Sequence, residues 1–223
     1  DVIKLFEVNT FASGLPSSGL VFNAVEAIIV WAGSGNDLVD ALENNPELRF
    51  YEAEVLRSRF ALSVDVHSGF HGRDRIWFPY ARSRKLFPNV PEVLALEQLF
   101  RRTHPEHRYL VEPQALNYTT HGDLWDYLYD VHRASASEGP FLPLTLELSA
   151  AAWYRKNPAQ LLSPAGFFHP VKAHRLSRVL RRHQVLFDFL LRATCSYEHW
   201  VPQALAHRNA LLREAEFKWG PQA

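Results

Sequence analysis

The sequence is poor in several residue types, and each shortage excludes a class of protein. Cys195 is its only cysteine among 223 residues, which excludes an intrachain disulfide framework and any zinc or iron–sulfur site built from several cysteines. The chain has no methionine, position 1 included. Its longest apolar stretch, residues 20–32, is interrupted by Asn23 and Glu26 and is too short to span a bilayer.

The sequence also has no excess charge, because Lys plus Arg and Asp plus Glu both number 24. No overall field therefore draws the chain to nucleic acid or to an anionic membrane, and we expect neither as a partner. The single cysteine favours a reducing, cytoplasmic compartment, and no signal-peptide pattern is present. The oligomeric state is left open.

Apolar residues are abundant, and their spacing alternates between strand and helix. Hydrophobic residues make up 47% and aromatic residues 13%, which is typical of a folded core. Strands alternating with helices predict an α/β fold with a mostly parallel mixed sheet flanked by helices. The expected strands cover residues 2–8, 60–66 and 143–148. The expected helices cover residues 20–32, 46–59, 91–102, 123–129, 174–193 and 198–217. Residues 69–89 are expected to form a long loop.

Two ionisable residues lie on the expected strands. His67 follows the strand of residues 60–66, and Glu147 interrupts the apolar stretch of residues 144–148. An ionisable group in a hydrophobic strand costs desolvation energy unless it has a partner or a task, so the pair indicates a functional site. The alternative is that both are buried structural residues bonded to backbone.

The residue types point to proton transfer next to a metal. An imidazole at a strand end is a natural zinc ligand, and a glutamate in apolar surroundings has the raised pKa that suits a proton shuttle. No H-E-x-x-H motif supplies further ligands, and we interpret His104 and His107 as surface residues.

Four motifs, taken in order, resemble a known family. They are His67-Ser68-Gly69-Phe70, Trp77-Phe78-Pro79-Tyr80, the segment 118–127 and the strand 144–148. Together they resemble the C-terminal part of the catalytic domain of the zinc carboxypeptidases (M14 type), and they are most similar to an uncharacterised bacterial branch. The resemblance covers roughly residues 50–195.

This resemblance implies a fold and a set of roles. Residues 1–223 would form a single layered α/β/α domain of carboxypeptidase type that lacks its N-terminal portion. His67 would be the third zinc ligand, and Glu147 the general base that deprotonates zinc-bound water and then protonates the leaving amine. Tyr118 would be the mobile tyrosine that closes over substrate, or else an ordinary amphipathic aromatic at the surface. Leu124, with Trp125, would line a side-chain pocket, or else fill the core.

The chain departs from the family pattern at two points. The H-x-x-E pair that supplies the first two zinc ligands is missing, since no histidine precedes His67, and so is the Asn-Arg motif that binds a substrate carboxylate. The zinc site is therefore incomplete in this chain. Arg73, Arg75 and Arg82 are the candidates for binding an anionic substrate, because a guanidinium matches a carboxylate with two parallel bonds; the alternative is a solvated basic loop.

Three functions remain for comparison. The leading hypothesis is a zinc-dependent carboxypeptidase-like hydrolase that cleaves a peptide or an amino-acid conjugate with a metal-activated water. The alternative is a non-catalytic peptide-binding domain on the same fold. A third interpretation, a nucleic-acid-binding helix at residues 172–183, is disfavoured by the neutral net charge and by the apolar opposite face of that helix.

Overall fold

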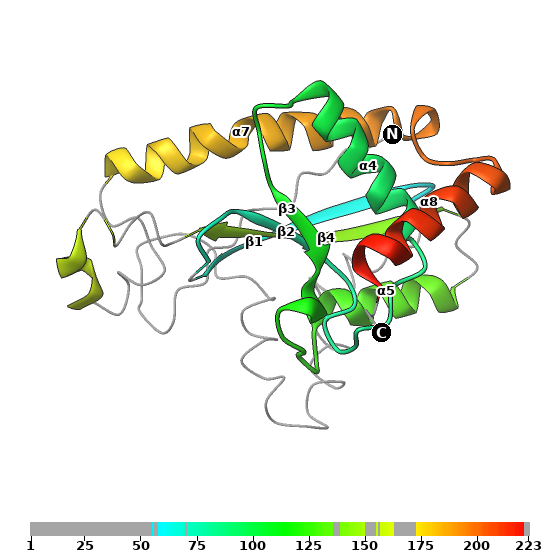
Figure 1. Cartoon of the computed structure of the whole chain (residues 1–223), viewed down its shortest axis with the longest axis horizontal. Helices are drawn as coiled ribbons and strands as arrows, with labels where there is room; N and C mark the ends of the chain where they lie inside the picture. Colours follow the sequence, from blue (N-terminus) through cyan, green and yellow to red (C-terminus); the bar gives the residue numbers. More distant parts are fainter. Residues whose placement is uncertain are drawn as a thin grey trace.

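A computed structural model of the chain describes residues 55, 58–69, 71–135, 139–149, 155, 157–162 and 173–220 (Figure 1). The strands are β1 (Ala61–Gly69), β2 (Arg75–Phe78), β3 (Leu110–Pro113) and β4 (Phe141–Ser149). The α-helices are α4 (Val90–Thr103), α5 (Leu124–Ala134), α7 (Ala173–Cys195) and α8 (Leu205–Trp219). Short 3₁₀ turns are η1 (Gln114–Leu116), η2 (Pro158–Leu162) and η4 (Tyr197–His199).

The four described strands form one mixed sheet in the order β1-β4-β2-β3. β1 runs parallel to β4, β2 runs parallel to β3, and β2 is antiparallel to β4. Two of these three pairings are parallel, as the sequence predicts. Every residue from Phe141 to Leu148 of β4 is buried, because β4 is a central strand with a neighbour on each side.

Helices lie on both sides of the sheet, with α4 and α7 on one side and α5 on the other (Figure 1). The α/β layering predicted from the alternation of strands and helices is therefore confirmed at that level. α8 packs against α4, and Arg208 on α8 donates to Glu92 on α4 at 2.8 Å. No helix in the described ranges is both long enough and apolar enough to cross a membrane.

Local signals fix where the helices begin. α4 has a proline in its first turn, where the missing backbone N–H costs nothing. α5 begins after Asp123, whose side chain accepts bonds from the backbone N–H groups of Trp125 and Asp126 at 2.9 and 3.0 Å. These bonds satisfy two of the donors that the first turn of a helix leaves without a partner.

The structure corrects three predictions. The expected loop at residues 69–89 contains β2, a strand of only four residues whose Ile76, Trp77 and Phe78 are buried. β3 was also missed, because four residues are too few to show a period. The expected helix at 198–217 divides into η4 and α8. The elements expected at 2–8 and 20–32, and most of the one at 46–59, lie outside the described residues.

Candidate acid–base site

One row of ionisable side chains crosses three adjacent strands. In the strand register His67 on β1 is paired with Glu147 on β4, and Glu147 is paired with Arg75 on β2. Residues directly opposite each other on neighbouring strands project from the same face of the sheet. The fold therefore brings His67 and Glu147, which are far apart in the sequence, to one place on the sheet together with a guanidinium.

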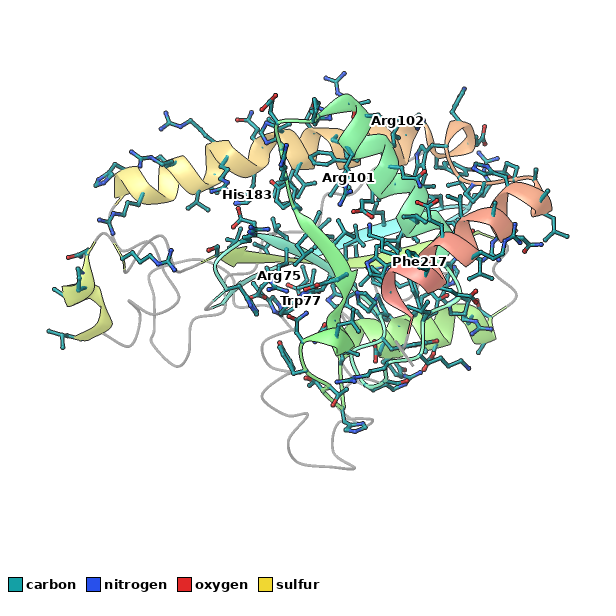
Figure 2. All side chains as sticks on the ribbon, viewed as in Figure 1. Arg75, Trp77, Arg101, Arg102, His183 and Phe217 are labelled. Atoms are coloured by element: carbon teal, nitrogen blue, oxygen red, sulfur yellow. The ribbon has the colours of Figure 1, made fainter. Side chains whose placement is uncertain are left out.

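A second row lies on the same face, two residues away from the first row: it precedes His67 and Glu147 on β1 and β4 and follows Arg75 on the antiparallel strand β2. It consists of Asp65, Thr145, Trp77 and Glu112, which are paired in that order across the sheet. The period of two that defines a strand places Asp65 beside His67. The two rows together form the candidate site, and Figure 2 shows Arg75 and Trp77 on the side of the sheet away from α7.

His67 lies between two carboxylates. Its Nε2 is 2.8 Å from Oδ2 of Asp65, and its Nδ1 is 4.0 Å from Oε2 of Glu147. The indole Nε1–H of Trp125, on α5, donates to the same oxygen of Asp65 at 3.1 Å. The side chain of His67 is 26% exposed and that of Glu147 only 6%, so solvent reaches the pair from the imidazole side.

The surroundings shift both protonation equilibria upward. Burial by itself lowers the pKa of His67, but the charge and hydrogen bond of Asp65, with smaller effects of Glu147 and Asp123, raise it to about 9. Burial raises the pKa of Glu147 to about 7, although the His67 charge opposes this change. Near neutral pH the imidazole is thus protonated, and the carboxyl exchanges its proton readily.

Two further groups border this pair. Burial, together with the charges of Asp126 and Asp65, raises the pKa of Asp123 to about 6. Tyr118 is 51% exposed, and its ring meets that of Trp77 edge-on with centroids 5.7 Å apart. Burial raises the pKa of the Tyr118 hydroxyl, and Glu147 and Asp123 add to the shift. Tyr118 therefore stands at the open border of the acid–base cluster.

Arg75 is held by a network within the sheet. Its Nη1 forms an ion pair with Glu112 and donates to Oδ1 of Asn117 at 2.9 Å. The same Glu112 oxygen accepts from Asn117 at 2.8 Å and from the Trp77 indole at 3.3 Å. A substrate carboxylate that binds Arg75 must therefore compete with Glu112.

A buried aspartate fixes the end of β4 close to Glu147. Asp74 is 5% exposed, and its Oδ1 accepts from the backbone N–H of Ser149 at 2.8 Å. Its Oδ2 lies 2.9 Å from Nη2 of Arg182 and 3.8 Å from Nε2 of His183, both on α7. The segment before β2, the end of β4 and helix α7 are therefore tied together at one carboxylate.

The remaining predicted site residues lie elsewhere. Leu124 is 2% exposed and belongs to the hydrophobic core, which is the alternative that the sequence left open for it. Arg73 lines a cavity walled by α4 and α7, on the opposite side of the sheet from the cluster. Arg82 pairs with Asp130 at 2.6 Å. The structure thus groups His67, Glu147, Arg75 and Tyr118, and leaves Leu124, Arg73 and Arg82 apart.

Sequence reasoning missed three members of the cluster. Asp65 precedes His67 by two positions on the expected strand, and this spacing was a usable signal for a shared face. Asp123 carries the sequence signature of a helix N-cap but gives no sign that it lies near Glu147. Glu112 belongs to β3, whose register with β2 only the structure defines.

Comparison with known proteins gives no relative. No protein-family model matches the chain, and searches of curated proteins and of solved structures return no match.

Proposed function

We propose that the chain is a carboxypeptidase-like hydrolase, which cleaves an amide bond in a peptide or amino-acid conjugate with Glu147 as the proton-transferring group. One observation carries the proposal: His67 and Glu147 are register partners on β1 and β4, with Nδ1 and Oε2 4.0 Å apart. The carboxypeptidase resemblance assigns its metal-binding histidine and its general base to these same two positions.

Zinc is the metal that the resemblance implies, and the described residues do not complete a site for it. In its neutral form His67 offers one nitrogen ligand, but within the described ranges no group of three His, Cys, Asp or Glu side chains is arranged to hold a metal ion. A catalytic zinc site needs three protein ligands and an open position. The steps below therefore use only side chains of this chain.

Glu147 has the protonation behaviour that amide hydrolysis requires. With a pKa near 7, its carboxylate can take a proton from a water molecule as the water oxygen attacks the carbonyl carbon. The protonated carboxyl can then return that proton to the leaving amine as the C–N bond breaks. Because Glu147 takes up one proton and gives it back, it returns to its starting protonation state at the end of each turnover.

His67 contributes a positive charge beside this proton transfer. Its imidazole is protonated at neutral pH because its pKa is about 9, and Asp65 fixes the ring through Nε2. A cation a few ångströms from the carboxyl can stabilise the oxyanion that forms when water attacks. The half-exposed position of Tyr118 at the border of the cluster supports the role of a side chain that covers bound substrate.

The second candidate function is a binding domain that holds a peptide without cleaving it. The absence from the sequence of the H-x-x-E motif of the carboxypeptidases motivates this alternative. Such a domain would bind the carboxylate of a peptide through the Arg75 guanidinium, and that carboxylate would have to displace Glu112 from its ion pair with Arg75.

The variant Glu147→Gln separates the two functions, because it keeps the shape of the side chain and removes its acid–base chemistry. For a hydrolase we expect kcat to fall by roughly 10²- to 10⁴-fold, since that is the usual contribution of a general base. The rate of release of the amino acid from N-acylated dipeptides measures the change, and binding of the same substrates should persist. Glu106→Gln, at an exposed position on the loop after α4, is the matched control.

Two results would decide against catalysis. The first is a wild-type protein that binds the dipeptides but releases no amino acid, with or without added zinc. The second is a Glu147→Gln variant with the rate of the wild type. Elemental analysis of the purified protein gives the zinc content per chain and shows whether the remainder of the chain supplies further ligands.

A further inference from the structure

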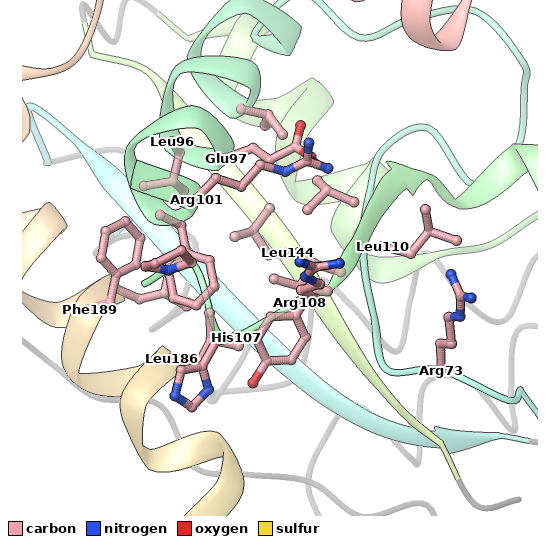
Figure 3. Close-up of a pocket in the computed structure, with 17 residues that line it drawn as sticks. Arg73, Leu96, Glu97, Arg101, His107, Arg108, Leu110, Leu144, Leu186 and Phe189 are labelled. Atoms are coloured by element: carbon pink, nitrogen blue, oxygen red, sulfur yellow. Dashed lines mark ion pairs between the residues drawn. The ribbon is translucent and has the colours of Figure 1, made fainter. Parts of the chain in front are cut away.

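A cavity of about 450 Å³ lies on the other side of the sheet from the acid–base cluster. It is enclosed by the sheet, by α4 and α7, and by the connection between α4 and β3 (Figure 3). A volume of this size suits a small organic ligand, since ligand pockets typically measure about 300–1,000 Å³. Its apolar wall includes Ile76, Leu144, Leu96, Phe100, Leu186 and Phe189.

The opening of this cavity carries positive charge. Arg73 and Arg108 both line it, both are exposed, and within the described ranges neither forms an ion pair. Arg101 also lines it but is bound to Glu97 at 2.7 Å, and Lys218 contacts the same glutamate. Among the described residues that line the cavity, Glu97 is the one carboxylate, and two cations already neutralise it. The charges of Arg73 and Arg108 are therefore available to a ligand.

Arg73 and Arg108 come from different connections. Arg73 precedes β2, and Arg108 precedes β3, the parallel neighbour of β2. Figure 3 shows the guanidinium of Arg108 near Leu144 and that of Arg73 separate from it, on another segment that lines the cavity. An apolar interior below a cationic opening is complementary to a molecule with an apolar body and one anionic end.

We propose that this cavity binds a small amphipathic carboxylate, with its alkyl or aryl body among the side chains of α4, α7 and the sheet and its carboxylate paired with Arg108 and Arg73. A carboxylate fits because its two oxygens match the two parallel N–H donors of a guanidinium. The site goes beyond the proposed hydrolase function, since it uses neither His67 nor Glu147. Glu147→Gln should therefore leave it unchanged.

Decanoate is the probe, and isothermal titration calorimetry measures its binding to the whole chain below the critical micelle concentration. We expect saturable binding with one site per chain. Decan-1-ol, which has the same chain and no charge, should bind at least about 10-fold more weakly, because a hydrogen bond to a charged group contributes more than one tenfold step in affinity. Decylammonium, with the opposite charge, should bind more weakly still.

Substitutions at the opening identify the anchor. Arg108→Gln should weaken decanoate binding about 10-fold and leave decan-1-ol binding unchanged, and Arg73→Gln should have a smaller effect of the same kind. Arg102→Gln is the matched control: Arg102 is exposed in the last turn of α4 and does not line the cavity (Figure 2). Equal affinities of the wild type and the Arg73→Gln/Arg108→Gln double variant would overturn the assignment.

A second pair of variants tests the site by charge. Arg108→Glu and Arg108→Gln both remove the guanidinium at an exposed position and differ by one negative charge. We expect the Glu variant to bind decanoate several-fold more weakly than the Gln variant, and decan-1-ol equally. Absence of saturable decanoate binding to the wild type, or no difference between this pair, refutes the proposal.

Discussion

The substitution Asp65→Asn tests whether the acid–base cluster works as its geometry implies. Asp65 contacts Nε2 of His67 at 2.8 Å and is the largest of the influences that raise the pKa of that imidazole. Asparagine keeps an oxygen that can accept from the Trp125 indole, so the packing of α5 against β1 is retained while the charge is removed.

The expected magnitude follows from the groups that remain. The rise of the His67 pKa from 6.5 to about 9 corresponds to roughly 3 kcal/mol in favour of the protonated ring. Without Asp65, burial continues to lower the pKa, and only Glu147 and Asp123 oppose it. Their pKa values are about 7 and about 6, so near neutral pH Glu147 carries part of its charge and Asp123 most of it, but neither makes the direct 2.8 Å contact that Asp65 makes with the ring. We therefore expect the pKa of His67 to fall well below 9, towards 6.5.

Nuclear magnetic resonance titration of the His67 ring in metal-free protein measures this pKa directly. The same substitution has a consequence for stability with a defined sign. Because folding raises the pKa of His67, its protonation stabilises the fold fully below pH 6.5, and this contribution is lost as the pH rises through about 9. The free energy of unfolding of the wild type should fall over that window, and that of Asp65→Asn should change much less.

Asp130→Asn is the control, because Asp130 pairs with Arg82 rather than with His67. It should leave the His67 pKa near 9. A His67 pKa that stays near 9 in the Asp65→Asn variant would refute the reasoning, because it would mean that Asp65 does not hold the proton on the ring.

Three further predictions concern stability. Asp126→Ala removes the carboxylate that accepts hydrogen bonds from the backbone N–H groups of Ala81 and Arg82 at 2.9–3.1 Å. Because buried donors are then left unpaired, the free energy of unfolding measured by urea titration should fall by about 2–3 kcal/mol. Arg208→Ala leaves the buried Glu92 without its ion pair and should lower the free energy of unfolding by about 1–3 kcal/mol. Arg213→Ala, on the exposed side of α8, is the control. Equal stability of the two variants would contradict this prediction. Folding raises the pKa of Glu147 from 4.5 to about 7, so its protonated form stabilises the fold fully below pH 4.5. This contribution, roughly 3 kcal/mol, is lost as the pH rises through about 7. Glu147→Gln should abolish that part of the pH dependence of stability, which thermal unfolding measures.

Part of the fold could be read from the sequence because it depends on local periodicity. The long buried strand β4 and the amphipathic helix α7 are both found where apolar spacing predicted them, with ends shifted by a few residues. The strands β2 and β3 could not be recognised in this way, because each has four residues and is stabilised by pairing within the sheet rather than by its own pattern.

The sequence by itself singled out His67 and Glu147 as candidates, since a histidine after a strand and a glutamate within an apolar strand are costly unless they have a partner or a role. Only the tertiary structure decided which groups act together. The parallel pairing of β1 with β4 sets His67 opposite Glu147, and the return of β2 beside β4 adds Arg75. Arg73, two residues before Arg75, lies before β2 begins and lines the cavity on the other side of the sheet, so the strand period does not place it. The physical reason is that strand pairing is a long-range choice, and one residue of register moves a side chain from one face to the other.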